Sequence, residues 1–389
     1  MLVGGLAVIA VPTAKLFGGV IPDGVSEKIG AEAVDALLTI IASSMLAVTT
    51  FSLSVMVSVY RSVASQWTPR AHRVQLKDTR TQTVLATFVG AYIYALLSII
   101  LLHTPFFSEG EIVVLFAMTI VVIVMIVATI LRWVLHLQTF GSLEQTANTI
   151  RDDTQRAMHE CVKHPALSAN PLTPDVIIPA DAITVRSERS GYIVRILTHA
   201  LQTAATDCQG YIWLTVKPGD YVNQGEVIGH ISGDIDTIKN AIKRFVDIGL
   251  HRDIPQDPEI GMVMLAEIGV KAMSPGVNDP GTAIWMMDRI MSVIYETPDQ
   301  VSPTCDRVWM PVFELHRAFY TSVDLLARYC GGAVEVQQAL FKRLGGVAHC
   351  DNPALAASAR ELGARLYARG QQCLPTDVDK QDIYKPDWI

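Results

Sequence analysis

Residues 112–134 read IVVLFAMTIVVIVMIVATILRWV, in which Arg132 carries the one charge. A helix crosses the apolar core of a bilayer with about 20 consecutive, mostly apolar residues. Two further runs meet this length, residues 36–60 and residues 84–102, the latter reading VLATFVGAYIYALLSIILL. The sequence therefore predicts an integral membrane protein built on an α-helical bundle of transmembrane spans.

A weaker apolar run opens the chain at residues 1–21, with four glycines and Lys15. It lacks the basic start and the small-residue cleavage pattern of a secretory signal peptide. We interpret it as a first, marginal span, and whether the natural chain begins further upstream stays open. The expected transmembrane region is residues 1–134, with three or four spans.

The remainder of the 389-residue chain is less apolar and reads like a globular sequence. A net charge of −7 gives no reason to expect a basic face, so we expect no nucleic acid as a partner. The cysteines form no C-x-x-C pair and no zinc-ligand spacing with a histidine, so we expect neither a metal nor a cofactor. They are Cys161, Cys208, Cys305, Cys330, Cys350 and Cys373.

The charges of the loops predict how the spans are oriented. Residues 61–80 hold five basic residues and one acidic residue, whereas the loops before residues 36 and 112 are mainly acidic. Basic loops stay on the cytoplasmic side of a membrane. We therefore expect a multi-pass protein of a bacterial inner membrane, with its C-terminal half in the cytoplasm.

Hydroxyl side chains recur along one face of the span at residues 36–60. They are Thr39, Ser43, Thr50, Ser54 and Ser58. Spacings of four and seven residues align them on one side of a helix. Such a stripe either packs against another helix, which is its more general use, or lines a pore. In either case we expect it to point towards a neighbouring helix or the central axis of a homo-oligomer, and not to lipid.

The chain after the spans is expected to fold as a cytoplasmic α+β domain in several parts. These are a connecting helix and Pro-rich linker at 135–180, a small β-barrel-like unit at 181–235, a helical domain at 236–374 and a polar tail at 375–389.

Residues 216–231, VKPGDYVNQGEVIGHI, predict short strands joined by a Pro-Gly-Asp turn and a glycine turn. The pattern resembles half of a biotinyl- or lipoyl-type barrel-sandwich, in which a lysine in an exposed hairpin carries the prosthetic group. Here Ser232, Gly233 and Asp234 follow, with no lysine. We therefore predict a structural β-module without an attached group.

Two Asp-Pro pairs, Asp257-Pro258 and Asp279-Pro280, predict helix starts, since Asp caps a helix and Pro fits its first turn. An earlier helix is predicted from Ile238, Ile242, Phe245 and Ile248, and later helices at 308–329, 333–344 and 354–371. The connector between the two Asp-Pro helices is tight.

This connector is the best candidate for a ligand site. Its polar residues are Ser274, Asn278, Asp279 and Thr282. Free backbone amides at a helix start bind anions, but Asp279 would satisfy those amides itself as a capping residue. No P-loop, dinucleotide fingerprint, zinc-protease motif or nucleophile elbow occurs, so we expect no catalytic residues and no enzyme.

Several motifs stand out together: SQWTPR at residues 65–70, Asp78, Thr81-Gln82, Gln256-Asp257-Pro258 and SPGVNDPGTA at residues 274–283. Together they resemble the DUF2254 family of predicted bacterial membrane proteins. The resemblance covers most of the chain, and its most specific element is the stretch around Asn278. No activity is established for that family, so the resemblance implies the architecture and adds no chemistry.

Two functions fit these features. An oligomeric channel or transporter would use the hydroxyl stripe, with the cytoplasmic domain assembling or gating the bundle. A membrane-anchored sensor or scaffold would instead bind a partner, a small ligand or an ion through the large cytoplasmic domain. A water-filled path along the stripe favours the first function, and a deep pocket with a sealed bundle favours the second.

Overall fold

The computed structural model describes residues 30–66, 68–76, 79–104, 107–138, 140–295, 298–383 and 385–389, together with Thr13 and Leu16. The chain divides into two compact units, residues 1–145 and 146–389. Apart from Thr13 and Leu16, the run at residues 1–21, predicted as a marginal first span, lies outside the described residues.

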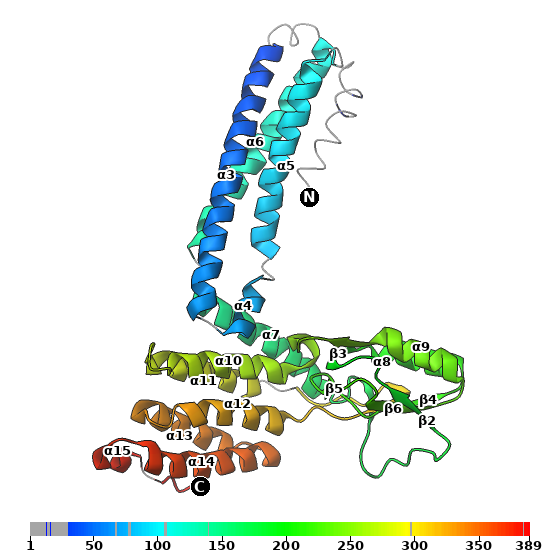
Figure 1. The fold of residues 1–389 in the computed structure, drawn as a ribbon, viewed down its shortest axis with the longest axis vertical. Helices are drawn as coiled ribbons and strands as arrows, with labels where there is room; N and C mark the ends of the chain where they lie inside the picture. Colours follow the sequence, from blue (N-terminus) through cyan, green and yellow to red (C-terminus); the bar gives the residue numbers. More distant parts are fainter. Residues whose placement is uncertain are drawn as a thin grey trace. The chain divides into compact units, whose positions relative to one another are not determined.

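Three long helices make up most of the described part of the first unit (Figure 1). They are α3 (Ala31–Gln66), α5 (Thr79–Leu102) and α6 (Glu109–Leu137), with the short α4 (Pro69–Leu76) between α3 and α5 in the chain. Each long helix contains a segment that is long and apolar enough to cross a membrane. The three strongest predicted spans are thus confirmed as long apolar helices that could cross a membrane, and each helix extends a few residues beyond its apolar run.

Apolar side chains fill the interior of this bundle. Leu38 of α3, Phe88 of α5 and Leu115 of α6 belong to one buried cluster. The buried hydroxyls of Tyr94 and Thr119 lie 3.0 Å apart and satisfy each other. Polar groups inside the hydrocarbon must be satisfied within the protein, and this pair of hydroxyls meets that requirement.

The second unit combines two sheets with helices. One sheet has five strands in the order β1-β8-β4-β6-β2, and the other has three in the order β5-β3-β7. The strands are β1 (Ala169–Pro171), β2 (Ile183–Arg186), β3 (Gly191–Ile196), β4 (Tyr211–Leu214), β5 (Tyr221–Val222), β6 (Val227–Ser232), β7 (Val246–Gly249) and β8 (Cys305–Met310). Helices α8 (Thr198–Asp207) and α9 (Ile235–Phe245) contribute Leu201 and Ile238 to the core beside the sheets.

The β region differs from the predicted barrel-like unit at residues 181–235. The described strands form two open sheets rather than a closed barrel, and β1, β7 and β8 come from outside that range. Within residues 216–231 the structure does contain two short strands, β5 and β6.

Two segments predicted as helix are strands. Ile248 lies in β7, which pairs with β3, whereas Ile238 and Ile242 lie in α9. Val308 lies in β8, between β1 and β4. β-Branched and aromatic residues such as Val308 and Trp309 favour a pleated, half-buried setting, and the pairing partners that provide it are remote in the sequence.

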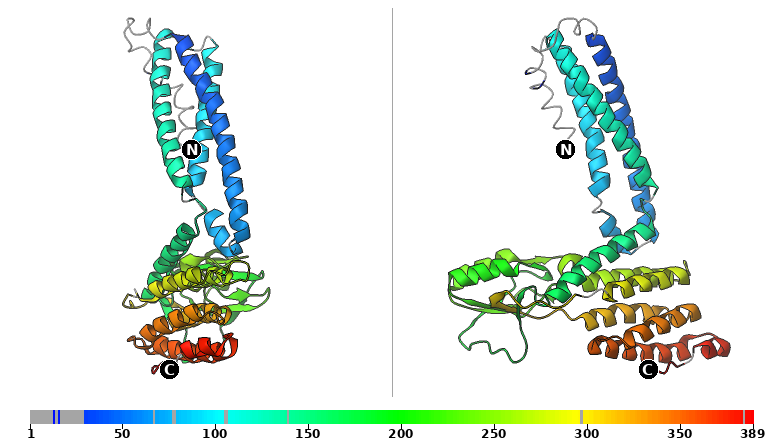
Figure 2. Two further views of the ribbon diagram at one scale, coloured as in Figure 1. Left: turned by 90° about the vertical axis from the view of Figure 1, so that its left-hand side faces the viewer. Right: turned by 180° about the vertical axis from the view of Figure 1, so that it is seen from behind.

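The remaining helices stack beside the sheets (Figure 2). They are α7 (Leu143–Lys163), which leads into this unit, α10 (Pro258–Ala272), α11 (Pro280–Tyr295), α12 (Leu315–Tyr329), α13 (Val334–Ala348), α14 (Pro353–Cys373) and α15 (Asp377–Asp382). Gly269 lets α10 approach α12, because a Cβ there would lie 2.6 Å from Leu326. The segment predicted as a polar tail contains α15, and its Trp388 indole lies against Gly345 and Gly363.

Candidate functional site

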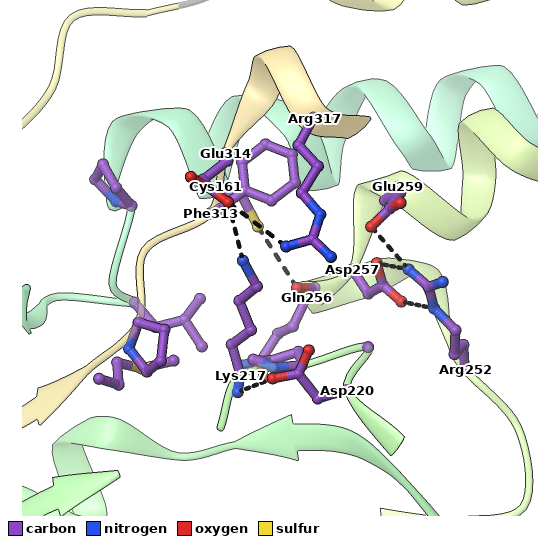
Figure 3. A pocket seen from close by; sticks show the side chains of 16 residues that line it. Cys161, Lys217, Asp220, Arg252, Gln256, Asp257, Glu259, Phe313, Glu314 and Arg317 are labelled. Atoms are coloured by element: carbon purple, nitrogen blue, oxygen red, sulfur yellow. Dashed lines mark hydrogen bonds and ion pairs between the residues drawn. The ribbon is translucent and has the colours of Figure 1, made fainter. Parts of the chain in front are cut away.

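A pocket of about 170 Å³ lies between the sheets and the helices of the second unit (Figure 3). Its walls come from the end of α7, the turn after β4, the segment leading into α10 and the segment between β8 and α12. Its charged residues are Lys217, Asp220, Arg252, Asp257, Glu259, Glu314 and Arg317. The pocket is therefore assembled from four distant stretches of sequence.

Arg252 forms a two-pronged ion pair with Asp257 on one side of the pocket. Its Nε and Nη2 donate to Oδ2 and Oδ1 of Asp257 at 2.5 and 2.8 Å, and Nη2 also reaches Glu259 at 3.3 Å. The side chain of Asp257 is only 5% exposed. Burial raises the pKa of Asp257, and the hydrogen bonds from Arg252 oppose that rise. Asp257 thus occupies the predicted helix start, but its carboxylate binds Arg252.

The main chain around this ion pair is held tightly. A Cβ at Gly219, where φ is +96°, would lie 2.8 Å from Asp257 Oδ2, so glycine is needed both for conformation and for space. The Gln256 side chain pairs with the main chain of Ile196, accepting from its N–H at 2.8 Å and donating to its carbonyl at 3.1 Å. These contacts fix the segment before α10 against the three-stranded sheet.

Lys217, Glu314 and Arg317 occupy the other side of the pocket (Figure 3). Lys217 Nζ donates to the carbonyl of Val312 at 3.0 Å and lies 3.8 Å from Glu314 Oε2. Arg317 Nη1 lies at the same 3.8 Å from that oxygen. Asp220 holds the turn below, where Oδ2 accepts from the main-chain N–H of Lys217 at 2.9 Å.

Cys161 lines the pocket from α7 with its thiol buried. Its side chain is buried, and Sγ lies 3.7 Å from the carbonyl of Gln256. Burial raises the pKa of this thiol to about 12, and the reactive form of cysteine is the thiolate. Within the described part of the chain no group of three or more His, Cys, Asp or Glu side chains is placed to hold a metal ion. The arrangement is suited to binding a charged ligand.

The predicted connector site forms one compact turn before α11. Asp279 Oδ1 accepts from the Thr282 N–H at 3.0 Å, and Oδ2 accepts from the Thr282 hydroxyl at 2.6 Å. These hydrogen bonds lower the pKa of Asp279. The carbonyl of Ser274 accepts from the N–H of Asn278 at 2.9 Å. Asp279 therefore occupies the amides that an anion would use, which fits the capping interpretation.

The predicted hydroxyl stripe of α3 is brought together on one face, and all five residues are exposed. The hydroxyls of Ser43, Thr50 and Ser54 bond to carbonyls of their own helix four residues earlier, each at 2.9 Å. The face of α3 that is buried in the bundle carries Leu38 and Met45 instead. Within the described residues of one chain, the stripe is thus not a packing face between spans.

The pocket residues carry little signal in the sequence. Arg252 stands out only as part of a charged loop, His251-Arg252-Asp253, and Asp220 only as a turn residue. Glu314 and Arg317 lie in a stretch that was predicted as helix from residue 308, and they become pocket residues because β8 ends before them. No spacing rule connects Lys217 with Arg317.

The three candidate spans and the separate α+β unit define a helical membrane protein. The chain belongs to the family described as Predicted membrane protein (DUF2254), whose model matches residues 1–345. Uncharacterized proteins of Mycobacterium bovis and Mycobacterium tuberculosis are each 22% identical to it in an alignment 364 residues long, and the match covers 88% of this chain and 69% of theirs. No solved structure matches the chain.

Proposed function

We propose that this protein is a membrane-anchored binding protein, in which the spans hold the second unit at the bilayer and its pocket binds a small polar ligand. The observation that carries the proposal is the pocket itself, into which side chains from four segments converge. Concave sites with a few fixed polar groups are the usual setting for small ligands.

The packing of the first unit supports an anchoring role. The space between α3, α5 and α6 is filled by residues such as Leu38, Phe88 and Leu115, as expected of a bundle that conducts nothing through its own interior. The basic loop at residues 61–80 supports a cytoplasmic location for the second unit.

A second candidate is an oligomeric channel or transporter, and the exposed hydroxyl stripe of α3 favours it. In an oligomer, several copies would bring Ser43, Thr50 and Ser54 to a shared axis or interface. Small polar residues favour contact between helices in a membrane over contact with lipid. In this case the second unit would assemble or gate the bundle.

Ligand-induced stabilisation of the purified full-length protein tests the first candidate. The compounds tested are amino acids, nucleotides, dicarboxylates and sugar phosphates. The substitution Glu314→Trp fills the pocket and serves as the variant that should not bind. At about 100-fold excess over its dissociation constant, a bound ligand is expected to raise Tm by roughly 5 °C. Glu361→Trp, at an exposed position of α14 outside the pocket lining, is the matched control.

We expect one class of compound to stabilise the wild-type protein and the control but not Glu314→Trp. If no compound separates these variants, the binding proposal fails. Ion flux into liposomes that is lost in Ser43→Leu, without any such stabilisation, would favour the channel instead.

A further inference from the structure

We infer that the pocket receives a ligand bearing a carboxylate or phosphate group, and that this anion displaces Glu314 from between Lys217 and Arg317. The inference rests on the proposed function, because it names the chemistry of the ligand for the same pocket. The lining carries charges of both signs, so its overall charge does not indicate which ligand it takes. The inference rests instead on how these charges are paired with one another.

Four of the seven charges are already engaged in close contacts within the fold. Arg252 holds Asp257 with two hydrogen bonds and contacts Glu259 at 3.3 Å. Asp220 accepts the main-chain N–H of the turn on which it lies. These groups gain little from a ligand, because their best partners are in place.

The remaining three charges are paired loosely. Lys217 Nζ and Arg317 Nη1 both lie 3.8 Å from the same oxygen, Glu314 Oε2, which is beyond hydrogen-bond distance. Among the described residues, the Lys217 ammonium donates one hydrogen bond, to the Val312 carbonyl, although an ammonium group has three donors. Two cations thus share one carboxylate without a close contact to it. An incoming oxyanion with several oxygens would accept short, charge-assisted bonds from both.

The position of Glu314 allows a ligand anion to displace its carboxylate from between Lys217 and Arg317. Its side chain is 40% exposed, whereas that of Lys217 is 22% exposed. It occupies the N-cap position of α12 without a side-chain capping bond, so its departure breaks no cap. The start of this 15-residue helix also favours negative charge at that place. Glu314 therefore acts as an internal stand-in for the ligand anion.

A divalent cation fits the pocket less well. Such an ion needs several carboxylate or carbonyl oxygens around one point, and two of the lining carboxylates, Asp257 and Glu259, are turned to Arg252. The cations at Lys217 and Arg317 would repel it.

Calorimetric titration of the full-length protein in detergent with inorganic phosphate and with succinate tests the inference, at constant ionic strength set with chloride. Glu314→Gln removes the competing charge and keeps the shape. We expect it to bind at least one of the two anions roughly tenfold more tightly than wild type, which corresponds to one charge-assisted hydrogen bond. Adding Lys217→Met to Glu314→Gln should then weaken binding about tenfold or more.

Two substitutions outside the pocket lining serve as matched controls. Lys243→Met removes a lysine from an exposed ion pair with Glu188, and Glu361→Gln removes an exposed glutamate from α14. Both should bind the anions as wild type does. A preference for phosphate or for succinate identifies which oxyanion the pocket takes.

Equal binding of both anions by wild type and Glu314→Gln, or no binding by either, overturns the inference. The proposed function fails separately. If a neutral or cationic compound stabilises wild type and not Glu314→Trp, the pocket binds ligand and only the anion inference is wrong.

Discussion

At the scale of single residues, the thiols provide a direct check of the pocket wall. Burial raises the pKa of both Cys161 and Cys330 to about 12, whereas Cys373 is exposed. Alkylation of the folded protein at mildly alkaline pH should therefore modify Cys373 and spare the two buried thiols, as peptide mass spectrometry would show. Denaturant should make all three reactive. Rapid modification of Cys161 in the folded protein would mean that the α7 wall of the pocket opens.

The ion pair of Arg252 and Asp257 makes a second residue-scale prediction. Arg252→Met leaves a buried carboxylate without its partner, and such a loss costs about 3–5 kcal/mol of folding free energy. Thermal unfolding of the full-length protein measures it. Arg195→Met is the control, because its ion pair with Asp247 is exposed and should cost under about 1 kcal/mol.

Asp257→Asn added to Arg252→Met should recover part of this stability, since it removes the unpaired charge. If the double variant is no more stable than Arg252→Met, the loss comes from packing of the arginine stem and not from the charge.

At the scale of elements, the start of α11 depends on one carboxylate. Asp279→Ala removes the cap on Thr282 and is expected to cost about 1 kcal/mol at neutral pH. The hydrogen bonds from Thr282 lower the pKa of Asp279 below its usual 3.8. A lowered folded-state pKa gives stability above the unfolded-state pKa that disappears as pH falls through the folded value.

The stability difference between wild type and Asp279→Ala should therefore shrink below about pH 3.8. Urea unfolding monitored at several pH values measures this. Ser274→Ala is the control and should be neutral, because Ser274 contributes its main-chain carbonyl to the turn. A difference that persists unchanged at low pH would show that the cap does not act through its charge.

The hydroxyl stripe of α3 makes a prediction about assembly. Its five residues are exposed, and the hydroxyls of Ser43, Thr50 and Ser54 already bond to their own helix, so packing between the described spans of one chain does not explain them. We expect the stripe to lie between copies, so Ser43→Leu or Thr50→Leu should shift the purified protein to a smaller oligomer in light scattering. Thr83→Leu, at an exposed threonine of α5 that also bonds to its own helix, should not. An unchanged mass for all three variants would place the stripe against lipid.

At the scale of the whole molecule, the sequence predicts those parts whose cause is local. The spans follow from the length and composition of residues 36–60, 84–102 and 112–134, because the bilayer imposes both. The arrangement of the sheets cannot be predicted in this way, because β8 pairs with β1 and β4, which are both remote from it in the sequence. The pocket depends on that pairing. Lys217 follows β4 and Arg317 follows β8, so both line the pocket because these two strands pair. No local sequence pattern predicts that pairing.

Membrane topology is the last prediction, and it follows from the order of the elements together with the charges. α5 and α6 separate the basic loop at residues 61–80 from the second unit, so two crossings must leave both on one side. The basic residues of the loop predict that this side is the cytoplasm. A membrane-impermeant maleimide applied to intact cells should therefore label neither Arg70→Cys nor the exposed Cys373, but should label Glu109→Cys at the first residue of α6. Permeabilised cells supply the positive control, in which all three positions react. Labelling of Arg70→Cys and Cys373 alone would reverse the orientation while keeping the spans. Labelling of only one of these two positions would contradict the predicted spans, because two crossings leave both positions on the same side. In that case α5 or α6 would not span the membrane.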